Sequence, residues 1–138
     1  MPPKVSIVTT TYNGQKYLEE SIGSMLSQTF DDFEFIIVDE GSTDNTLETL
    51  RKMDDPRIRI IQQKNQAQAR ALIVGDEQAR GELIARIDQD DYSLSNRLMR
   101  QVNFMDTHST VTLCGSRFEE LYGDNFIPQR VQFAQTDA

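Results

Sequence analysis

The feature that most constrains this chain is an acidic turn that directly follows a short, largely apolar segment. Asp88, Asp90 and Asp91 occupy three of four consecutive positions after residues 83–87. Carboxylates this close repel one another unless water, hydrogen bonds or a cation separates them. The segment alone is compatible with a solvated loop or with a site for a hard cation such as Mg²⁺, which favours carboxylate and water oxygens.

A second acidic turn favours the cation site. Asp39 and Glu40 follow the nearly continuous apolar run 33–38, and Gly41 and Ser42 come next. Such a run is typical of a strand that is buried on both faces, as in a parallel sheet. Two acidic strand ends in one small domain predict a single site.

Strand-like and helix-like patterns alternate along the chain. The predicted strands are 5–8, 33–38, 57–61, 83–87 and 111–114, and the predicted helices are 14–28, the segment around Leu47 and Leu50, 66–79 with Gly81 as its C-cap, and the segment from Leu98 to Met105. This alternation predicts right-handed βαβ units in a three-layer α/β/α fold with a mostly parallel, twisted sheet. Ligands of such sheets bind beyond the carboxyl ends of the strands, where the strand order reverses. Residues 122–125 are expected to form a turn between two extended pieces, and 132–138 show little pattern.

Charge and cysteine content narrow the possible partners. The net charge of −8 argues against nucleic acid, and a phosphate-bearing ligand would need a cation to bind so acidic a protein. Cys114 is the one cysteine, and its apolar neighbours predict a reduced core residue of a cytoplasmic protein. We see no signal peptide and no segment near the roughly 18 apolar residues of a membrane span, which leaves peripheral attachment open.

Several familiar sites are excluded by their motifs. The chain has no P-loop motif, and no G-x-G-x-x-G follows the first strand. A calcium-binding loop starting at Asp88 would need glycine and glutamate where Ser93 and Met99 stand. The single histidine, His108, is expected to be solvated, which argues against a catalytic triad.

Five segments, taken in order, strongly resemble family 2 glycosyltransferases. They are VSIVTTTYN at 5–13, SQT at 27–29, FIIVDEGSTD at 35–44, ARGE at 79–82 and DQDD at 88–91. The resemblance extends from about Lys4 to about Val102. It implies an inverting, nucleotide-sugar-dependent enzyme with the GT-A fold, a Rossmann-like nucleotide-binding architecture.

The resemblance also implies roles for single residues in nucleotide binding. Thr10, Thr11 and Tyr12 match the strand-end segment that contacts the nucleotide. Asp39 and Glu40 match the acidic pair that reads the base and ribose, since a carboxylate accepts hydrogen bonds from a base N–H or a hydroxyl.

The acidic turn matches the family's DxD-type segment. One of Asp90 and Asp91 is expected to ligate Mg²⁺ or Mn²⁺, while Asp88 and the remaining carboxylate orient ribose or metal-bound water. The metal would bridge the acidic protein to the diphosphate and stabilise the departing nucleoside diphosphate. Arg70 matches an arginine that closes over the nucleotide, the alternative being a solvated helix arginine.

Two departures from the family pattern affect the nucleotide pocket. Glu40 stands where aspartate is usual. The loop 65–71 lacks the glycine usually found before the third helix and the asparagine usually found after the arginine.

The general base of the reaction is not identified, because no context around Glu119, Glu120 or Asp124 matches the family's base motif. We therefore expect residues 1–138 to form a single nucleotide-sugar-binding domain that is truncated on its acceptor-binding side. The implied function is transfer of a sugar from a UDP-sugar to a saccharide or lipid-linked acceptor, with inversion. It would serve cell-surface polysaccharide synthesis in the cytoplasm, at the inner face of the membrane.

Two alternatives belong to other classes. One is a degenerate or isolated nucleotide-binding module without catalysis. The other is a receiver-like, Mg²⁺-binding signalling domain, which needs an acidic pair after the first strand and a lysine after the last. Thr9–Thr11 and Gly115–Arg117 stand there instead and disfavour it.

Overall fold

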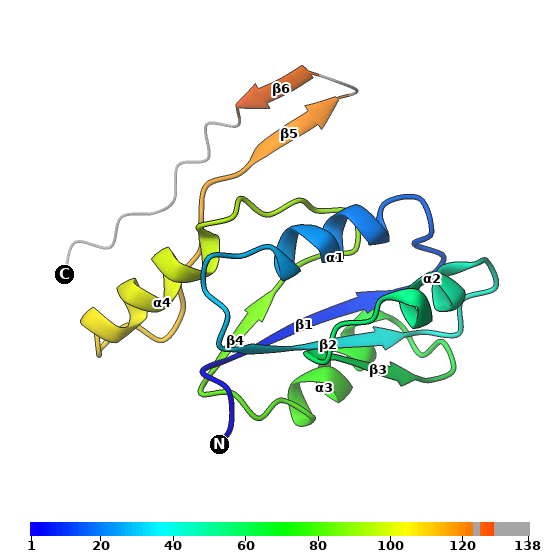
Figure 1. Ribbon diagram of the computed structural model, residues 1–138, viewed down its shortest axis with the longest axis horizontal. Coiled ribbons are helices and arrows are strands. Elements are labelled where there is room, and N and C mark those ends of the chain that lie inside the picture. The colour runs from blue at the N-terminus through cyan, green and yellow to red at the C-terminus, as the bar shows by residue number, and fades with distance from the viewer. Residues whose placement is uncertain (123–124, 129–138) are drawn as a thin grey trace. The chain divides into compact units, whose positions relative to one another are not determined.

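The computed structural model describes residues 1–122 and 125–128, and the chain divides into two units, 1–99 and 100–138. The larger unit is built on a parallel four-stranded sheet with the strand order β3-β2-β1-β4 (Figure 1). Its strands are β1 (Val5–Thr11), β2 (Phe33–Asp39), β3 (Ile58–Gln62) and β4 (Leu83–Arg86). The order reverses between β1 and β4, as predicted for a ligand-binding doubly wound sheet.

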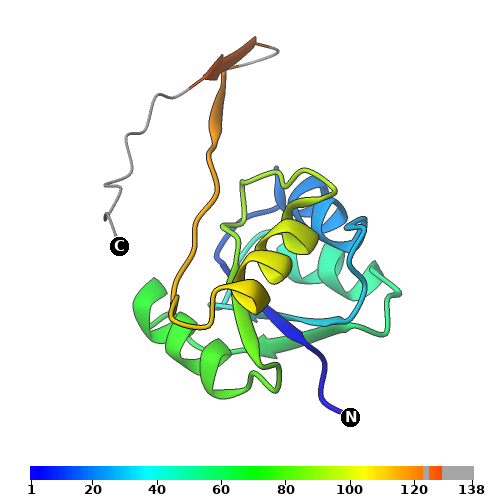
Figure 2. The same ribbon diagram turned by 90° about the vertical axis from the view of Figure 1, so that its left-hand side faces the viewer.

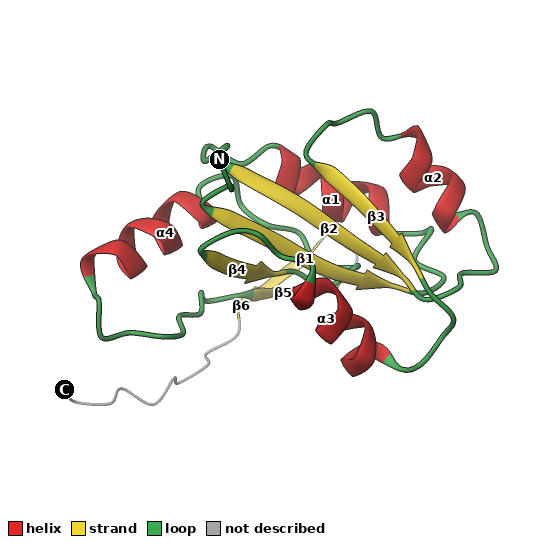
Figure 3. Cartoon of the chain, turned by 90° about the horizontal axis from the view of Figure 1, so that it is seen from below, coloured by secondary structure: helices red, strands yellow, loops and turns green. Residues whose placement is uncertain are grey.

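Helices cover both faces of this sheet and make the three predicted layers. Helices α1 (Leu18–Leu26) and α2 (Thr46–Lys52) lie on one face, and α3 (Gln68–Glu77) lies on the other (Figures 1 and 3). Helix α4 (Arg97–Thr107) follows β4. No helix within the described ranges is long and apolar enough to cross a membrane.

Burial follows the sequence pattern of each strand. Every residue of β1 and β2 is buried, which agrees with their continuous runs of apolar and small polar residues. Strand β4 alternates between half-buried and exposed residues, as an edge strand does. Between the sheet and α3, the core contains Val8, Ile36, Val38 and Ala71.

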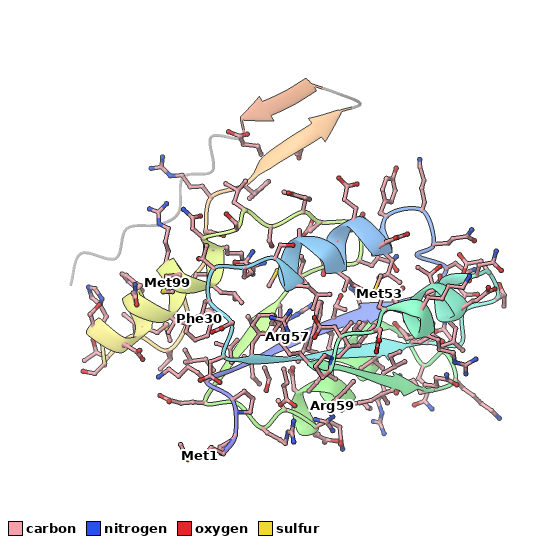
Figure 4. The ribbon with its side chains drawn as sticks, viewed as in Figure 1. Met1, Phe30, Met53, Arg57, Arg59 and Met99 are labelled. Atoms are coloured by element: carbon pink, nitrogen blue, oxygen red, sulfur yellow. The ribbon has the colours of Figure 1, made fainter. Side chains whose placement is uncertain are left out.

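Two arginines at the start of β3 connect helix ends to the sheet from opposite sides (Figure 4). The guanidinium of Arg57 donates to the carbonyl of Leu26 at the end of α1, at 3.2 Å. That of Arg59 donates to Glu34 at 3.0 Å and to the carbonyl of Gln78, just after α3, at 3.1 Å. Both contacts lie near the amino ends of β1 and β2, away from the acidic turns.

Helices α1 and α3 are shorter than predicted at their ends, whereas α4 extends slightly beyond the predicted segment from Leu98 to Met105. The predicted helix 14–28 is α1, Leu18–Leu26, because residues 12–17 form a loop at the end of β1. The predicted C-cap of α3 at Gly81 is wrong, since the helix ends at Glu77 with Gln78 as its C-cap. Gly81 instead packs against β1, where an added Cβ would lie 2.5 Å from the Ser6 nitrogen.

The smaller unit contains an antiparallel strand pair, β5 (Glu119–Tyr122) and β6 (Asn125–Pro128) (Figure 2). These are the two predicted extended pieces, while 123–124 and the predicted patternless tail 132–138 lie outside the described residues. The predicted strand 111–114 is wrong. Residues 111–118 form no regular secondary structure, Leu113 is 87% exposed, and Cys114 is only half-buried. Four apolar-looking residues are too few to distinguish a strand from an extended loop.

Candidate functional site

The carboxyl ends of the central strands open into a cleft of about 330 Å³. Its walls come from the loops after β1, β2 and β4 and from the first turn of α3. The lining residues are Thr10, Tyr12, Glu40, Gln68, Asp88, Gln89 and Asp90. Both acidic turns therefore contribute to one cleft, beside the reversal of strand order.

The loop after β1 is held in place by the loop after β2. Asn13 has the left-handed φ of 49°, which asparagine tolerates better than most residues. Its side-chain oxygen accepts from the backbone N–H of Thr43 at 2.8 Å, and its own N–H donates to the Ser42 hydroxyl at 3.0 Å. These bonds hold the loop, and the buried Thr10 near the end of β1 and the 43% exposed Tyr12 just after β1 both line the cleft.

The carboxylates of the acidic pair have different surroundings. Asp39 is 2% exposed, and its two oxygens accept hydrogen bonds from the hydroxyl and backbone N–H of Ser42, at 2.5 and 3.3 Å. Glu40 is 4% exposed and lines the cleft. Burial, and then the charge of Asp39, raise the pKa of Glu40. Glu40 is thus the member of the pair that a ligand can meet, while Asp39 shapes the turn.

The turn after β4 places two of its three aspartates in the cleft. Asp88 and Asp90 line it, whereas Asp91 is exposed and donates its backbone N–H to the Asp88 carbonyl at 3.1 Å. Loss of solvation at its carboxyl, and then the charges of Asp88 and Asp90, raise the pKa of Asp91. The turn therefore carries a concentration of negative charge that a cation would relieve.

Polar side chains of α1 and of Gln28, just after it, anchor this turn and the residues that follow it. The Ser21 hydroxyl donates to the Asp88 carbonyl at 3.1 Å, and the Ser24 hydroxyl accepts from the backbone of Ser93 at 3.0 Å. The Gln28 amide donates to the Leu94 carbonyl at 2.8 Å. Gln28 belongs to the SQT segment, which the sequence associates with the family without indicating a role. The structure shows it to be part of the support for the acidic turn.

Arg70 does not line the cleft, although the resemblance assigns it to nucleotide closure. It is exposed in the first turn of α3, while Gln68, two residues earlier, reaches the cleft wall. The helix is preceded by Ala67 at φ 76° and ψ 147°, a conformation that glycine adopts far more readily than alanine. This strained alanine lies within the loop in which the family's glycine is missing.

Sequence reasoning missed two lining residues, Gln68 and Gln89. Gln89 carried a signal, because it lies inside the acidic turn, between Asp88 and Asp90. Gln68 carried none, since its place depends on where α3 begins. Thr11, which was predicted to contact the nucleotide, is buried and donates its hydroxyl to Gln89 at 2.7 Å. His108 is exposed, as predicted.

The residues present fit a divalent cation that is shared with a ligand. Within the described part of the chain, no group of three His, Cys, Asp or Glu residues is arranged to hold a metal. Mg²⁺ is usually bound by one or two carboxylates together with water and substrate phosphates. Asp88 and Asp90 provide such a partial donor set at the cleft.

Sequence comparison identifies relatives over most of the chain. The model of the family described as Glycosyl transferase family 2 matches residues 6–136. An uncharacterized glycosyltransferase of Haemophilus influenzae is 34% identical over 126 residues, which are 88% of this chain and 50% of that protein. The putative teichuronic acid biosynthesis glycosyltransferase TuaG of Bacillus subtilis is 36% identical over 106 residues, 75% of this chain and 42% of that protein.

Comparison with solved structures also finds glycosyltransferases. The structure of S. aureus TarS residues 1–349 in complex with UDP-GlcNAc is similar with a TM-score of 0.73 and 32% sequence identity. The similarity covers 77% of this chain and 32% of that one. The chain thus spans half or less of the length of the proteins it resembles.

Proposed function

This chain belongs to glycosyl transferase family 2, and from that premise we propose that it forms the donor-binding part of an enzyme that transfers a sugar from a UDP-sugar. The acceptor would be a saccharide or lipid-linked sugar, and the anomeric configuration would invert. The observation that carries the proposal is the single cleft that receives Thr10, Glu40 and Asp90 from three separate strand ends. Family membership also removes the receiver-like alternative.

The comparisons support the choice of donor and of product class. TarS, which shares the fold at 32% identity, has been solved with UDP-GlcNAc. TuaG is described as a putative glycosyltransferase of teichuronic acid biosynthesis. We therefore propose a UDP-sugar donor and a role in the synthesis of a cell-surface polysaccharide, at the cytoplasmic face of the membrane.

The nucleotide would lie against the ends of β1 and β2. We propose that Tyr12 and Thr10 contact it, and that Glu40 accepts a hydrogen bond from a base N–H or a ribose hydroxyl. Asp39 would hold the turn through Ser42. Arg70 would reach the nucleotide from outside the described cleft wall, on the exposed side of α3.

The diphosphate would lie near the turn after β4. Asp90 would hold Mg²⁺ or Mn²⁺ from the cleft wall, with Asp91 as the second candidate and Asp88 orienting ribose or water. When bound, the metal would supply Lewis-acid stabilisation of the departing diphosphate. The role of the chain's own residues is to bind and orient the nucleotide-sugar, because they bring uncharged hydrogen-bonding side chains and carboxylates to one cleft.

The carboxylates that line this cleft, Glu40, Asp88 and Asp90, bind the donor in this proposal, so the carboxylate that deprotonates the acceptor hydroxyl lies elsewhere. We propose that it belongs to an acceptor-binding part of a longer enzyme, because the matched segments make up only 50% of the Haemophilus influenzae relative and 42% of TuaG. The same observation favours the second candidate function, a module that binds the nucleotide-sugar without transferring the sugar.

Calorimetric titration of UDP tests the donor site directly. UDP should bind in the presence of Mn²⁺ and bind much more weakly after EDTA is added. Asp90→Ala should abolish the effect of the metal, whereas Asp91→Ala should retain it. UDP binding that is identical with Mn²⁺ and with EDTA would contradict the metal-bridged donor site.

A further inference from the structure

Gln89 lines the cleft and joins the acidic turn to the end of β1 and the loop after it by direct hydrogen bonds. Its Oε1 accepts from the hydroxyl of Thr11 at 2.7 Å and from the backbone N–H of Tyr12 at 3.2 Å. Gly14 leaves room for this contact, because a Cβ at that position would overlap Gln89 Oε1. The amide is therefore held on one side by Thr11 at the end of β1 and by Tyr12 and Gly14 in the loop that follows.

These contacts determine which way the amide faces. A backbone N–H can only donate, so the atom that faces Tyr12 must be the oxygen. Oε1 and Nε2 occupy opposite corners of one planar group, so fixing Oε1 also fixes Nε2. Within residues 1–122 and 125–128, Gln89 forms no hydrogen bond other than those at Oε1. Two N–H donors thus remain for a molecule in the cleft that Gln89 lines.

The charge of the cleft indicates what kind of group these donors would meet. Glu40, Asp88 and Asp90 line the same space and can offer only oxygen acceptors when ionised. They repel a phosphate group. A neutral amide that lies between Asp88 and Asp90 in the sequence can donate hydrogen bonds to phosphate oxygens without competing for the cation that those carboxylates would hold.

We propose that Gln89 is a substrate-binding residue whose Nε2 donates to the diphosphate oxygens of the nucleotide-sugar. The inference rests on the proposed function and deepens it, because it assigns the binding of the diphosphate to Gln89, the residue between Asp88 and Asp90. It also links the two halves of the donor site. The nucleotide-contacting loop at Tyr12 and the turn at Asp90 are positioned through one amide.

The substitution Gln89→Glu separates binding of the ligand from support of the loop. The variant keeps an oxygen that can accept from Thr11 and Tyr12, and it replaces the Nε2 donors with a second acceptor. We expect the variant to remain folded, with a melting temperature somewhat below that of the wild type because a fourth carboxylate joins Asp88, Asp90 and Asp91. We expect UDP affinity in the presence of Mn²⁺ to fall by about tenfold or more, the usual scale for losing a hydrogen bond to a charged group.

Two control variants and a second ligand identify the cause. Gln68→Glu adds the same charge to the same cleft and should weaken UDP binding less than Gln89→Glu does. Thr11→Val removes one hydrogen bond to Oε1 and leaves Nε2 in place. It should lower the melting temperature, while its UDP affinity should fall less than that of Gln89→Glu. Uridine, followed by ligand-observed NMR, lacks phosphates and should bind the wild type and Gln89→Glu alike.

The outcomes separate the two proposals. If Gln68→Glu and Gln89→Glu lost equal amounts of UDP affinity, or if Gln89→Glu bound UDP as the wild type does, the role of Nε2 would be overturned. The proposed function would still stand. A loss of uridine binding equal to that of UDP would also overturn it. Wild-type protein that binds neither UDP nor other nucleoside diphosphates with Mn²⁺ would overturn the donor site and this inference together.

Discussion

Arg80 and Glu34 form an ion pair at the end of the sheet opposite the cleft, with Arg80 Nη2 2.7 Å from Glu34 Oε2. Glu34 also accepts from the Ser6 hydroxyl at 2.7 Å, the backbone N–H of Arg80 at 2.8 Å and Arg59 at 3.0 Å. Its side chain is 4% exposed. The ARGE segment, one of the five that carry the family resemblance, therefore bonds to Ser6 of β1 and Glu34 of β2, far from the cleft. Arg59 of β3 reaches the same carboxylate.

The environment of Glu34 predicts an acid-sensitive stability. Burial alone would raise its pKa, but hydrogen bonds from Arg80, Ser6 and Arg59 outweigh it and lower the pKa from 4.5 to about 2. The folded pKa lies below the unfolded one, so this contribution is complete above about pH 4.5 and is lost as the pH falls toward 2. Urea denaturation should show Glu34→Gln to be less stable by about 2 kcal/mol at pH 7, with the gap closing in acid.

Glu82→Gln is the matched control for that measurement. Glu82 belongs to the same segment and pairs with Lys4 at 2.9 Å, but its side chain is 69% exposed. An exposed ion pair contributes roughly 0–1 kcal/mol. A gap between wild type and Glu34→Gln that stays constant from pH 7 to pH 3 would contradict the assignment.

The close approach of α3 to the sheet depends on Gly75. A Cβ there would lie 2.5 Å from Val8 Cγ1 and 3.3 Å from Val38 Cγ2, both in the buried core. Gly75→Ala should therefore destabilise the protein by about 1–3 kcal/mol in denaturant titrations, because the helix must move away. Gly23→Ala in α1 is the control, since nothing lies within 4 Å of its Cβ position. Helix propensity should make that variant more stable by up to about 1 kcal/mol.

The strained residue before α3 predicts a stabilising substitution. Ala67 has φ 76° and ψ 147°, where a Cβ is unfavourable. Ala67→Gly should raise the free energy of unfolding by about 1 kcal/mol, whereas Ala69→Gly inside the helix should lower it by a similar amount. Thermal melting of the two variants checks this, and a loss of stability in both would contradict the strain.

The sequence was sufficient to predict the architecture, because β1 and β2 are buried on both faces and their runs, 5–8 and 33–38, lie within the observed strands. The convergence of the two acidic turns also followed from the parallel arrangement, in which strand ends meet at one edge. Short segments were less predictable. The run 111–114 has a strand-like composition, but Leu113 faces solvent and no ladder includes it.

Contacts between loops that are far apart in the sequence could not be predicted from the local sequence pattern. The bond between Thr11 and Gln89 joins residues 78 positions apart, so no spacing rule reveals it. The strain at Ala67 could be suspected only from the missing glycine, since the backbone angles depend on how the loop returns from β3 to α3. The division of the acidic pair into a cleft-facing Glu40 and a turn-forming Asp39 depends on the Ser42 hydroxyl, which donates to Asp39, and no local pattern indicates that contact.

The buried charge of Glu40 predicts opposite effects on stability and on binding. Burial and Asp39 raise its pKa, so its ionised form costs folding free energy, and this cost appears as the pH rises through about 4.5 and beyond. Glu40→Gln should therefore raise the melting temperature at pH 7 and weaken nucleotide binding in calorimetry, because a carboxylate accepts a stronger hydrogen bond than an amide oxygen does. Asp44→Asn is the control of opposite sign, since hydrogen bonds from Thr46 lower the pKa of Asp44 and the variant should lose stability. If Glu40→Gln lowered the melting temperature and left the affinity unchanged, Glu40 would be a structural residue of the turn, and the ligand would have to be read by other groups of the cleft.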